Sequence, residues 1–499
     1  MPKKSLKIKK SARTILTKRG YAIVKDRFSF NSIQECKTDL TVKPYINEDF
    51  GGVAVEFPIY LESNKKFYLP KHYGFEKFGE PDQIKITKGF KIDLEFKGQL
   101  RDKQLPVVQS FMDSCDDSSF ATKSNGGIIS VPCGWGKTIM GLWLIAKLKR
   151  KTLIVVHKEF LMNQWKERIK EFLPEARVGT LQASTIDIDN KDIVIGMLQS
   201  LSIKEYDSSV FQDFGFTIVD ECHHIGAEVF SRALPKINTY YSLGLSATPN
   251  RSDGLTKVFT LYLGPMIYRV ISNDDKKVRV NIIRYSDTNT EYCKEEVTAY
   301  GKMCVPRMIN NIAANENRNK LIVFIAKRLV EKGKQILLLS DRRNHLSYLY
   351  GQINKFTTVG YYIGGMKQKD LDKSEKANVI LGTYPMSSEG LDIPTLDAAI
   401  FATPKSSIEQ SIGRITRKVH EEIPIAYDIV DNFSIFPNQL KKRMRVYKRL
   451  KYDVYSGSLN INNNNISEGK LEYFMDNNIE FIDMGSKKKK KEVCLIEDD

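Results

Sequence analysis

The chain lacks any paired cysteine pattern and any long apolar run. Its seven cysteines are scattered over 499 residues, and no two of them form a CxxC pair. An odd, unpatterned set of this kind is typical of a reducing compartment and argues against structural zinc. No uninterrupted apolar stretch approaches the roughly 20 residues of a membrane-spanning helix, and none of signal-peptide length follows the basic N-terminus. We therefore expect neither a membrane protein nor a secreted, disulfide-stapled one.

Acidic residues are too few to balance the basic ones. Lys and Arg number 77 against 60 Asp and Glu, which leaves a net charge of +17. Such an excess favours a polyanionic partner, because each phosphate that Lys or Arg neutralises releases counterions and adds affinity. A basic surface kept for solubility, or basic tails acting as import signals, would give the same charge. The charge alone does not separate these interpretations.

The rhythm of apolar runs divides the chain into segments. A chain of 499 residues with 41% hydrophobic composition is too long for one ordinary core, so about three domains are expected. Short apolar runs alternate with segments of helical period in two regions, which is typical of parallel sheets covered on both faces. The predicted segments are a flexible basic arm (1–20), a β-rich accessory domain (21–95), two α/β domains (96–265 and 318–455) with a connecting segment between them (266–317), and a low-complexity basic tail (456–499) with one short helix near Gly469–Met475.

A glycine loop follows the apolar run at 128–131. It reads Pro-Cys-Gly-Trp-Gly-Lys-Thr and leads into a segment of helical period. Strand, glycine loop and helix N-terminus together form an anion cradle of backbone N–H groups. Lys137 is predicted to bridge the β and γ phosphates and Thr138 to ligate Mg²⁺, although Val131 stands where the strict pattern has Gly. The predicted nucleotide-binding residues of this loop are Pro132, Cys133, Gly134, Trp135, Gly136, Lys137, Thr138 and Ile139.

Two adjacent acids, Asp220 and Glu221, follow the apolar run at 216–219. This places both carboxylates at the carboxyl end of a predicted strand, where open α/β sheets bind ligands. Asp220 is predicted to hold Mg²⁺, Glu221 to orient the attacking water, and His223 to link the nucleotide to the next motif. Adjacent acids after a strand are often only an exposed turn, but the preceding Lys137 loop favours the functional interpretation.

Two further motifs lie downstream. Ser246 and Thr248 end another apolar run and are predicted to sense the nucleotide state. Arg414 and Arg417, about one helical turn apart, are predicted arginine fingers that stabilise charge on the γ-phosphate. An isolated arginine pair would more simply be a solvated basic helix face, but Gln410 and Gly413 complete a known motif.

In this order the motifs resemble those of a superfamily 2 helicase, over roughly residues 100–436. The resemblance implies an α/β fold with two tandem RecA-like parallel-sheet domains. It makes Gln104, with Arg101, the adenine contact, and it makes the segment 152–165 similar to helicase motif Ia. It also implies that Thr383 touches the nucleic-acid strand and that Gly390 and Asp392 shape the interface between the domains.

The details resemble the XPB-like branch of DNA helicases. The Asn250-Arg-Ser-Asp-Gly-Leu extension and Leu263-Gly-Pro-Met-Ile-Tyr carry this likeness, but the Arg-Glu-Asp tripeptide of that branch is missing. Residues 39–44 and 67–75 resemble helicases of large cytoplasmic DNA viruses, whose poxvirus relative helps to release transcripts. The implied protein is a monomeric 3′-to-5′ helicase that uses ATP and Mg²⁺ and acts on DNA rather than RNA. Transcription or replication proteins are the implied partners, and no membrane is involved. The implied location is the cytoplasm or the virion, with the nucleus an alternative because of the basic tails.

Three rival functions stay open at this stage. An RNA helicase would share the architecture, and so would a DNA translocase that does not separate strands. A non-catalytic ATP switch on nucleic acid belongs to a different class, but a pure binder would not need Glu221. The chain has three tryptophans, Trp135, Trp143 and Trp165, and we interpret them as core or interface residues rather than as base-stacking platforms.

Overall fold

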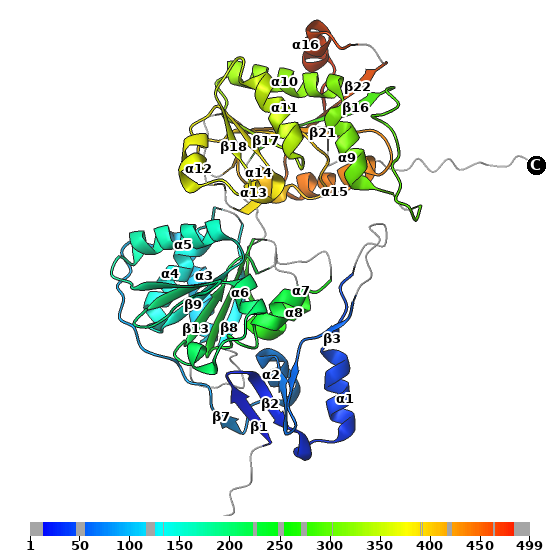
Figure 1. Ribbon diagram of the computed structural model, residues 1–499. Helices are drawn as coiled ribbons and strands as arrows, with labels where there is room; N and C mark the ends of the chain where they lie inside the picture. The colour runs from blue at the N-terminus through cyan, green and yellow to red at the C-terminus, as the bar shows by residue number, and fades with distance from the viewer. Residues whose placement is uncertain are drawn as a thin grey trace, which may run out of the picture. The chain divides into compact units, whose positions relative to one another are not determined.

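The chain divides into two compact units, Met1–Ser272 and Asn273–Asp499 (Figure 1). A computed structural model describes residues 13–45, 55–115, 125–132, 134–222, 227–247, 254–270, 277–301, 303–389, 391, 393–416, 422–462 and 465–483. Each unit contains one large sheet of mixed α/β architecture. The predicted fold class is therefore confirmed.

The large sheet of the first unit has eight strands in the order β11-β10-β12-β9-β13-β14-β8-β15. All neighbours are parallel except β10 and β11. Its strands are β8 (Gly126–Ser130), β9 (Thr152–Val156), β10 (Val178–Gln182), β11 (Thr185–Asp187), β12 (Ile193–Met197), β13 (Phe216–Val219), β14 (Tyr241–Ser246) and β15 (Met266–Arg269). The central strands β8, β9, β13 and β14 are buried along their whole length, because helices cover both faces of a parallel sheet.

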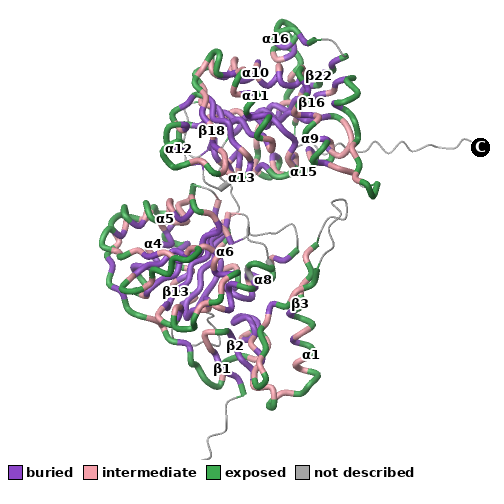
Figure 2. Tube along the Cα trace, in the orientation of Figure 1, coloured by how far each residue is buried: buried purple, intermediate pink, exposed green. Residues whose placement is uncertain are grey.

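Successive residues of each strand pack into different cores. Ile128 belongs to one apolar cluster and Ile129 to the other, and Leu153 and Ile154 divide in the same way. The helices α3 (Leu105–Ser114), α4 (Lys137–Leu148) and α5 (Glu159–Phe172) contribute to the cluster of Ile129. The helices α6 (Leu198–Ile203), α7 (Ala227–Ala233) and α8 (Thr256–Leu263) contribute to the cluster of Ile128. The prediction of a sheet covered on both faces is confirmed for this unit, as the buried strands in Figure 2 show.

A smaller sheet packs within the same unit. Its strand order is β5-β6-β2-β1-β7, and it is accompanied by two helices and a two-stranded pair, β3 with β4. These elements are β1 (Thr14–Thr17), β2 (Gly20–Val24), α1 (Phe30–Asp39), β3 (Thr41–Val42), β4 (Phe57–Pro58), β5 (Leu61–Glu62), β6 (Lys66–Leu69), α2 (Lys71–Phe78) and β7 (Gln83–Ile84). Tyr21, Phe67 and Tyr73 share an apolar cluster with Phe259 of α8, so this segment is joined to the first α/β domain through a common core.

The predicted basic arm (1–20) is wrong at its end, because residues 14–17 are strand β1. β1 pairs antiparallel with β2, from Thr14 with Ile23 to Thr17 with Gly20. Lys18 then donates from Nζ to the main-chain carbonyls of Phe211 (3.2 Å) and Phe214 (2.7 Å). The many basic residues around this short β-branched run hid its strand character from the composition.

The second unit holds another eight-stranded sheet, in the order β18-β19-β17-β20-β21-β16-β22-β23. Only β23 is antiparallel to its neighbour. The strands are β16 (Arg279–Asp287), β17 (Ile336–Leu339), β18 (Val359–Tyr362), β19 (Val379–Gly382), β20 (Ala398–Phe401), β21 (Ile425–Asp431), β22 (Asp453–Ile461) and β23 (Glu480–Phe481).

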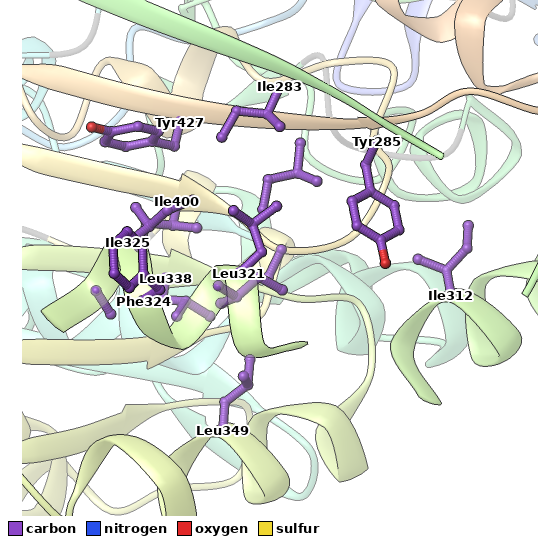
Figure 3. Packing of buried hydrophobic residues seen from close by; sticks show 14 of the residues in the cluster. Ile283, Tyr285, Ile312, Leu321, Phe324, Ile325, Leu338, Leu349, Ile400 and Tyr427 are labelled. Atoms are coloured by element: carbon purple, nitrogen blue, oxygen red, sulfur yellow. The ribbon is translucent and has the colours of Figure 1, made fainter. Parts of the chain in front are cut away.

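Helices also supply two apolar clusters in this unit. One cluster includes residues of α9 (Val305–Ala314), α10 (Glu316–Glu331), α11 (Arg343–Ile353) and α16 (Glu468–Asn477). Figure 3 shows Leu321 and Phe324 of α10 beside Leu338 and Ile400 of the sheet. The other cluster includes residues of α12 (Gln368–Ser374), α13 (Tyr384–Glu389), α14 (Glu409–Ile412) and α15 (Phe436–Arg449).

Two predicted boundaries of the second domain are wrong. The connecting segment (266–317) contains β16, and the tail (456–499) contains most of β22. These strands pair with each other over nine positions, from Arg279 with Asp453 to Asp287 with Ile461. Gly457 resembles a linker glycine in the sequence, but a Cβ there would lie 2.3 Å from the carbonyl oxygen of Asn478. Close backbone approach therefore requires this glycine, and the short helix predicted near Gly469–Met475 is confirmed as α16.

Within the described part of the chain, no helix is both long enough and apolar enough to cross a membrane.

Candidate active site

Three predicted motifs meet at the carboxyl edge of the first large sheet. The glycine loop follows β8, Ser246 ends β14, and Asp220 follows β13. These strands are neighbours in the order β13-β14-β8 and are all parallel. Ser246 is in register with Ser130, and its carbonyl accepts from Val131 N at 3.1 Å. Parallel strands bring their carboxyl ends to one edge, which is where α/β sheets bind ligands.

The glycine loop depends on backbone conformations that favour glycine. Gly134 and Gly136 both have φ near 80°, in the left-handed region. Gly136 is also the N-cap of α4, which begins at Lys137. A Cβ on Gly136 would lie 2.6 Å from Nε2 of Gln104. The loop thus presents the N-terminus of a helix at the sheet edge, which is the local geometry of an anion cradle.

Lys137 and Glu221 form an ion pair across this edge. Nζ of Lys137 lies 3.1 Å from Oε1 of Glu221, and the side chains are only 10% and 14% exposed. Opposite charges attract strongly where so little water screens them. Glu221 has a φ of 45°, a conformation that is uncommon for a non-glycine residue and that clusters at functional sites. The predicted phosphate-binding lysine and the predicted water-orienting acid are therefore in direct contact.

Asp220 lies behind this pair and is buried. Its Oδ2 accepts from Nε1 of Trp165 at 2.8 Å, and its Oδ1 accepts from the backbone N of Glu221 at 2.9 Å. Burial, helped by the negative charge of Glu221, raises the pKa of Asp220 to about 6, while Lys137 and the two hydrogen bonds oppose the rise. Both oxygens of the carboxyl group are thus held in a fixed orientation.

Trp165 is the functional contact that the sequence interpretation missed. It was predicted to be a core residue, and it is fully buried on α5. It also donates the hydrogen bond that orients Asp220. The signal available in the sequence was the indole N–H itself, because a buried tryptophan usually needs an acceptor for it.

Gln104 and Arg101 donate hydrogen bonds to main-chain carbonyls of the glycine loop. Gln104 Oε1 accepts from Arg101 N at 2.8 Å, and its Nε2 donates to the carbonyl of Trp135 at 2.7 Å. Arg101 Nη2 donates to the carbonyl of Gly134 at 3.3 Å. Both ends of the Gln104 amide therefore hold protein atoms, although an amide retains one further donor and one further acceptor site. The adenine contact of Gln104 and Arg101 stays a prediction.

In the second unit, predicted residues also follow the carboxyl ends of strands. Thr383 follows β19, and its carbonyl accepts from the N–H groups of Met386 (3.1 Å) and Ser387 (3.0 Å). Gln410 lies on α14. The predicted residues outside the described part of the chain are Cys133, His223, Thr248, Gly390, Asp392 and Arg417.

The spacing of Arg414 and Arg417 suggests one continuous helix, but the helix that precedes Arg414 ends before it. α14 ends at Ile412, and the N–H groups of Arg414 and Ile415 bond three residues back, to the carbonyls of Ser411 and Ile412. This tighter turn rotates the side chains away from α-helical spacing. Arg414 is buried and donates from Nη1 to the carbonyl of Leu391 at 2.8 Å.

Comparison with known proteins agrees with this geometry. Residues 97–251 match the family described as "Type III restriction enzyme, res subunit". The chain is 37% identical over 484 residues to "Putative ATP-dependent RNA helicase L396" of Acanthamoeba polyphaga mimivirus, covering 94% of this chain and 91% of that protein. The chain belongs to the superfamily 2 helicases. This helicase is also 31% identical over 382 residues to "Putative helicase 161L" of Invertebrate iridescent virus 6, covering 72% of this chain and 83% of that protein.

The fold of the helicase has a counterpart among solved structures. It is similar to S. cerevisiae Dbp5 bound to RNA and ADP BeF3, with a TM-score of 0.50 and 12% identity, over 74% of this chain and 92% of that chain. At this identity the likeness concerns the fold alone. The two sheets therefore match tandem RecA-like domains, and the predicted likeness to viral helicases is confirmed. The helicase is an enzyme that hydrolyses ATP.

Proposed function

We propose that this helicase uses ATP hydrolysis to move along a nucleic-acid strand in the 3′-to-5′ direction. The observation that carries the proposal is the 3.1 Å pair of Lys137 and Glu221, with Asp220 held behind it. A binding module needs a cation for phosphate, but it has no use for a buried carboxylate beside that cation. Phosphoryl transfer needs both, because it depends on positioning of the phosphates and of the attacking water.

The two members of the pair take separate roles when ATP binds. Lys137 exchanges the Glu221 carboxylate for oxygens of the β and γ phosphates. Glu221 is then free to orient a water molecule and to accept its proton, as a general base within hydrogen-bond reach does. The resting ion pair thereby keeps both groups charged and in position before the substrate arrives.

The residues around Asp220 fit a magnesium ion. Mg²⁺ prefers oxygen ligands, retains several waters, and is usually held by one or two carboxylates together with the substrate phosphates. Asp220 offers an oriented carboxyl group, and Thr138 offers a hydroxyl in the first turn of α4. Bound there, Mg²⁺ would neutralise charge on the β and γ phosphates. We assign Asp220 and Thr138 to this ion.

Trp165→Phe should weaken the binding of magnesium in a protein that still folds. Phenylalanine keeps most of the buried ring but removes the N–H that holds Asp220 Oδ2 at 2.8 Å. Loss of such an orienting partner typically costs roughly 10- to 100-fold in metal affinity or activity. We expect the Mg²⁺ concentration for half-maximal ATPase activity to rise by at least about tenfold.

Trp143→Phe is the matched control, because Trp143 lies on α4 with its ring centroid 5.2 Å from Lys147 Nζ, and Asp220 accepts its indole hydrogen bond from Trp165 instead. Its magnesium dependence should stay that of the unmodified protein. Equal behaviour of the two variants would contradict an orienting role for Trp165.

The remaining predicted residues complete the proposal. We assign Arg414 and Arg417 to the charge that develops on the γ-phosphate. Arg414 donates from Nη1 to the carbonyl of Leu391, and its guanidinium carries five N–H donors in all. We assign His223, Ser246 and Thr248 to the coupling of nucleotide state to movement. Of the second unit, Thr383 and Gln410 are assigned to the nucleic-acid strand, and Gly390 and Asp392 to the interface that transmits the movement.

Two kinds of strand are supported by different observations. The XPB-like motifs favour DNA. The mimivirus relative, which aligns with 94% of this chain, is named an RNA helicase, and this favours RNA. The net charge of +17 supports either one, because contacts to phosphates are blind to sequence and dominate non-specific affinity. DNA is the strand that we propose, and RNA is the second candidate.

Steady-state ATPase activity tests the proposal directly. The protein is assayed alone and then with single-stranded DNA, duplex DNA or RNA at matched salt. The rate measured for Lys137→Ala, prepared in the same way, gives the background from contaminating ATPases and is subtracted. Greater stimulation by DNA than by RNA supports the DNA motor, and unwinding of a 3′-tailed but not a 5′-tailed duplex supports its polarity. Stimulation by RNA alone selects the second candidate. Stimulation without unwinding of any duplex identifies a translocase, and no stimulation contradicts a nucleic-acid motor.

A role in viral transcript release or in replication, as a monomer in the cytoplasm or the virion, extends the proposal. Its support is the viral origin of the relatives. Fractionation of cells that make the protein would test its location. Light scattering of the pure protein would test its monomeric state.

A further inference from the structure

Helix α15 is basic from Lys441 to its end at Arg449. From Phe436 to Tyr452 the chain carries seven Lys and Arg residues and no Asp or Glu. None of the predicted motifs includes this helix. A stretch with charge of one sign has two parts in a folded protein, an inner face that must be neutralised and an outer face that meets solvent.

The inner face of α15 is neutralised within the second unit. Arg443 is buried, and its Nε donates to Asp428 Oδ2 at 2.8 Å. Tyr447 is also buried and donates its hydroxyl to the same carboxylate oxygen at 2.8 Å. Together with buried Leu440, these contacts fix the helix rigidly on β21.

The outer face is not neutralised. Lys441, Lys442, Arg445 and Lys448 are exposed, and we call them the α15 basic face. Lys441 donates to Asn438 Oδ1 at 3.0 Å. Among the residues that the structure describes, no carboxylate pairs with Lys442, Arg445 or Lys448. Like charges three and four residues apart on a helix repel each other by a few tenths of a kcal/mol per pair, and a polyanion would relieve this repulsion.

Helix α15, which carries the basic face, lies next to α14, which carries Gln410. Arg449, at the end of α15, pairs with Glu409 at the start of α14. Leu440 and Tyr447 share an apolar cluster with Ile408 and Ile412. Figure 1 shows α14 and α15 on the same side of the second sheet, opposite α10 and α11. A ligand on this face would therefore sit on an element that contacts a predicted strand-coupling motif directly.

We propose that the α15 basic face binds the sugar-phosphate backbone of the strand on which the helicase moves. This rests on the proposed function. Lys441 and Lys448 are seven residues apart, or about 10 Å along the helix axis at ~1.5 Å per residue. This length matches about three nucleotides of a strand in stacked, B-form geometry, at ~3.4 Å per step. Lysine and arginine on a rigid helix hold phosphates without reading bases, as a motor that moves over any sequence requires.

The test is the salt dependence of nucleic-acid binding by the full-length protein. Fluorescence anisotropy with a labelled single strand gives Kd over a series of NaCl concentrations for the unmodified protein and for Lys442→Ala/Arg445→Ala/Lys448→Ala. Each lost phosphate contact lowers the slope of log Kd against log salt by about 0.7 on single strands, so the triple variant should lose about 2. At ~0.1 M salt this corresponds to a rise in Kd of about tenfold or more.

The matched control is Lys332→Ala/Lys355→Ala/Lys376→Ala. These three lysines are exposed and precede β17, β18 and β19, at the amino edge of the same sheet. The control removes the same charge from the same unit, but from turns outside α15. Its slope should change by less than half as much as that of the α15 variant.

The outcomes separate this proposal from the proposed function. If the unmodified protein binds and both triple variants weaken equally, only the overall charge matters and the α15 site is wrong. If the unmodified protein binds no nucleic acid, both proposals fall. Should the triple variant unfold at a lower temperature, Lys442→Ala, Arg445→Ala and Lys448→Ala are measured singly. Each should then lower the slope by about 0.7, and an unchanged slope in all three would overturn the site.

Discussion

Glu221→Gln should leave ATP binding intact and nearly abolish ATP hydrolysis. Glutamine keeps the size of the side chain but cannot accept a proton from water. General-base catalysis typically contributes about 10²- to 10⁴-fold to a rate, so we expect a loss of turnover in that range. Lys137 lies 3.1 Å from Glu221. With the competing carboxylate removed, Lys137 is free for phosphate, and ATP affinity should be unchanged or higher.

Single-turnover hydrolysis and equilibrium binding of ATP measure the two effects separately. Glu228→Gln is the matched control, because Glu228 lies on α7 of the same unit, is 56% exposed and pairs with Arg232. Its turnover should equal that of the unmodified protein. A Glu221→Gln variant that kept more than a tenth of the rate would remove Glu221 from the role of base.

Lys137→Ala should lose both ATP binding and turnover. The substitution removes the cation that cradles phosphate. It also leaves Glu221, only 14% exposed, beside the buried carboxylate of Asp220 without the charge that offsets them. Removing one hydrogen-bond donor that stabilises developing negative charge costs about 10²- to 10³-fold in kcat, and we expect a loss of at least this size for the lysine. The pKa of Asp220 should rise further, since Lys137 is among the groups that now lower it.

ATP binding and steady-state ATPase activity at saturating nucleic acid check this result. Lys147→Ala is the control on the same helix, since Lys147 is exposed and near the ring of Trp143 rather than the sheet edge. Near-normal activity of Lys137→Ala, with the control also normal, would refute the assignment of the glycine loop.

Some contacts at the site could not have been found in the sequence. Trp165 and Asp220 are 55 residues apart, and their hydrogen bond exists only because α5 packs against the face of β13. Gln104, which is predicted to read adenine, also donates from Nε2 to the carbonyl of Trp135 in the glycine loop, 31 residues away. Trp165 and Trp135 lie far along the chain from the residues they contact, and no local pattern marks either partner.

The amino-acid sequence by itself determined central strands such as β9, β13, β17 and β20, the glycine loop and the acids that follow β13. These features are local, because a short apolar run bounded by polar residues and a glycine before a helix have physical consequences within a few residues. Tertiary structure alone decided that β16 and β22, 174 positions apart at Arg279 and Asp453, belong to one sheet. It also decided that Lys137 meets Glu221 and that one face of α15 is neutralised by Asp428 while the other is not. Pairing over such separations is set by the packing of whole elements, where the free energy comes from burial that no single segment can achieve alone.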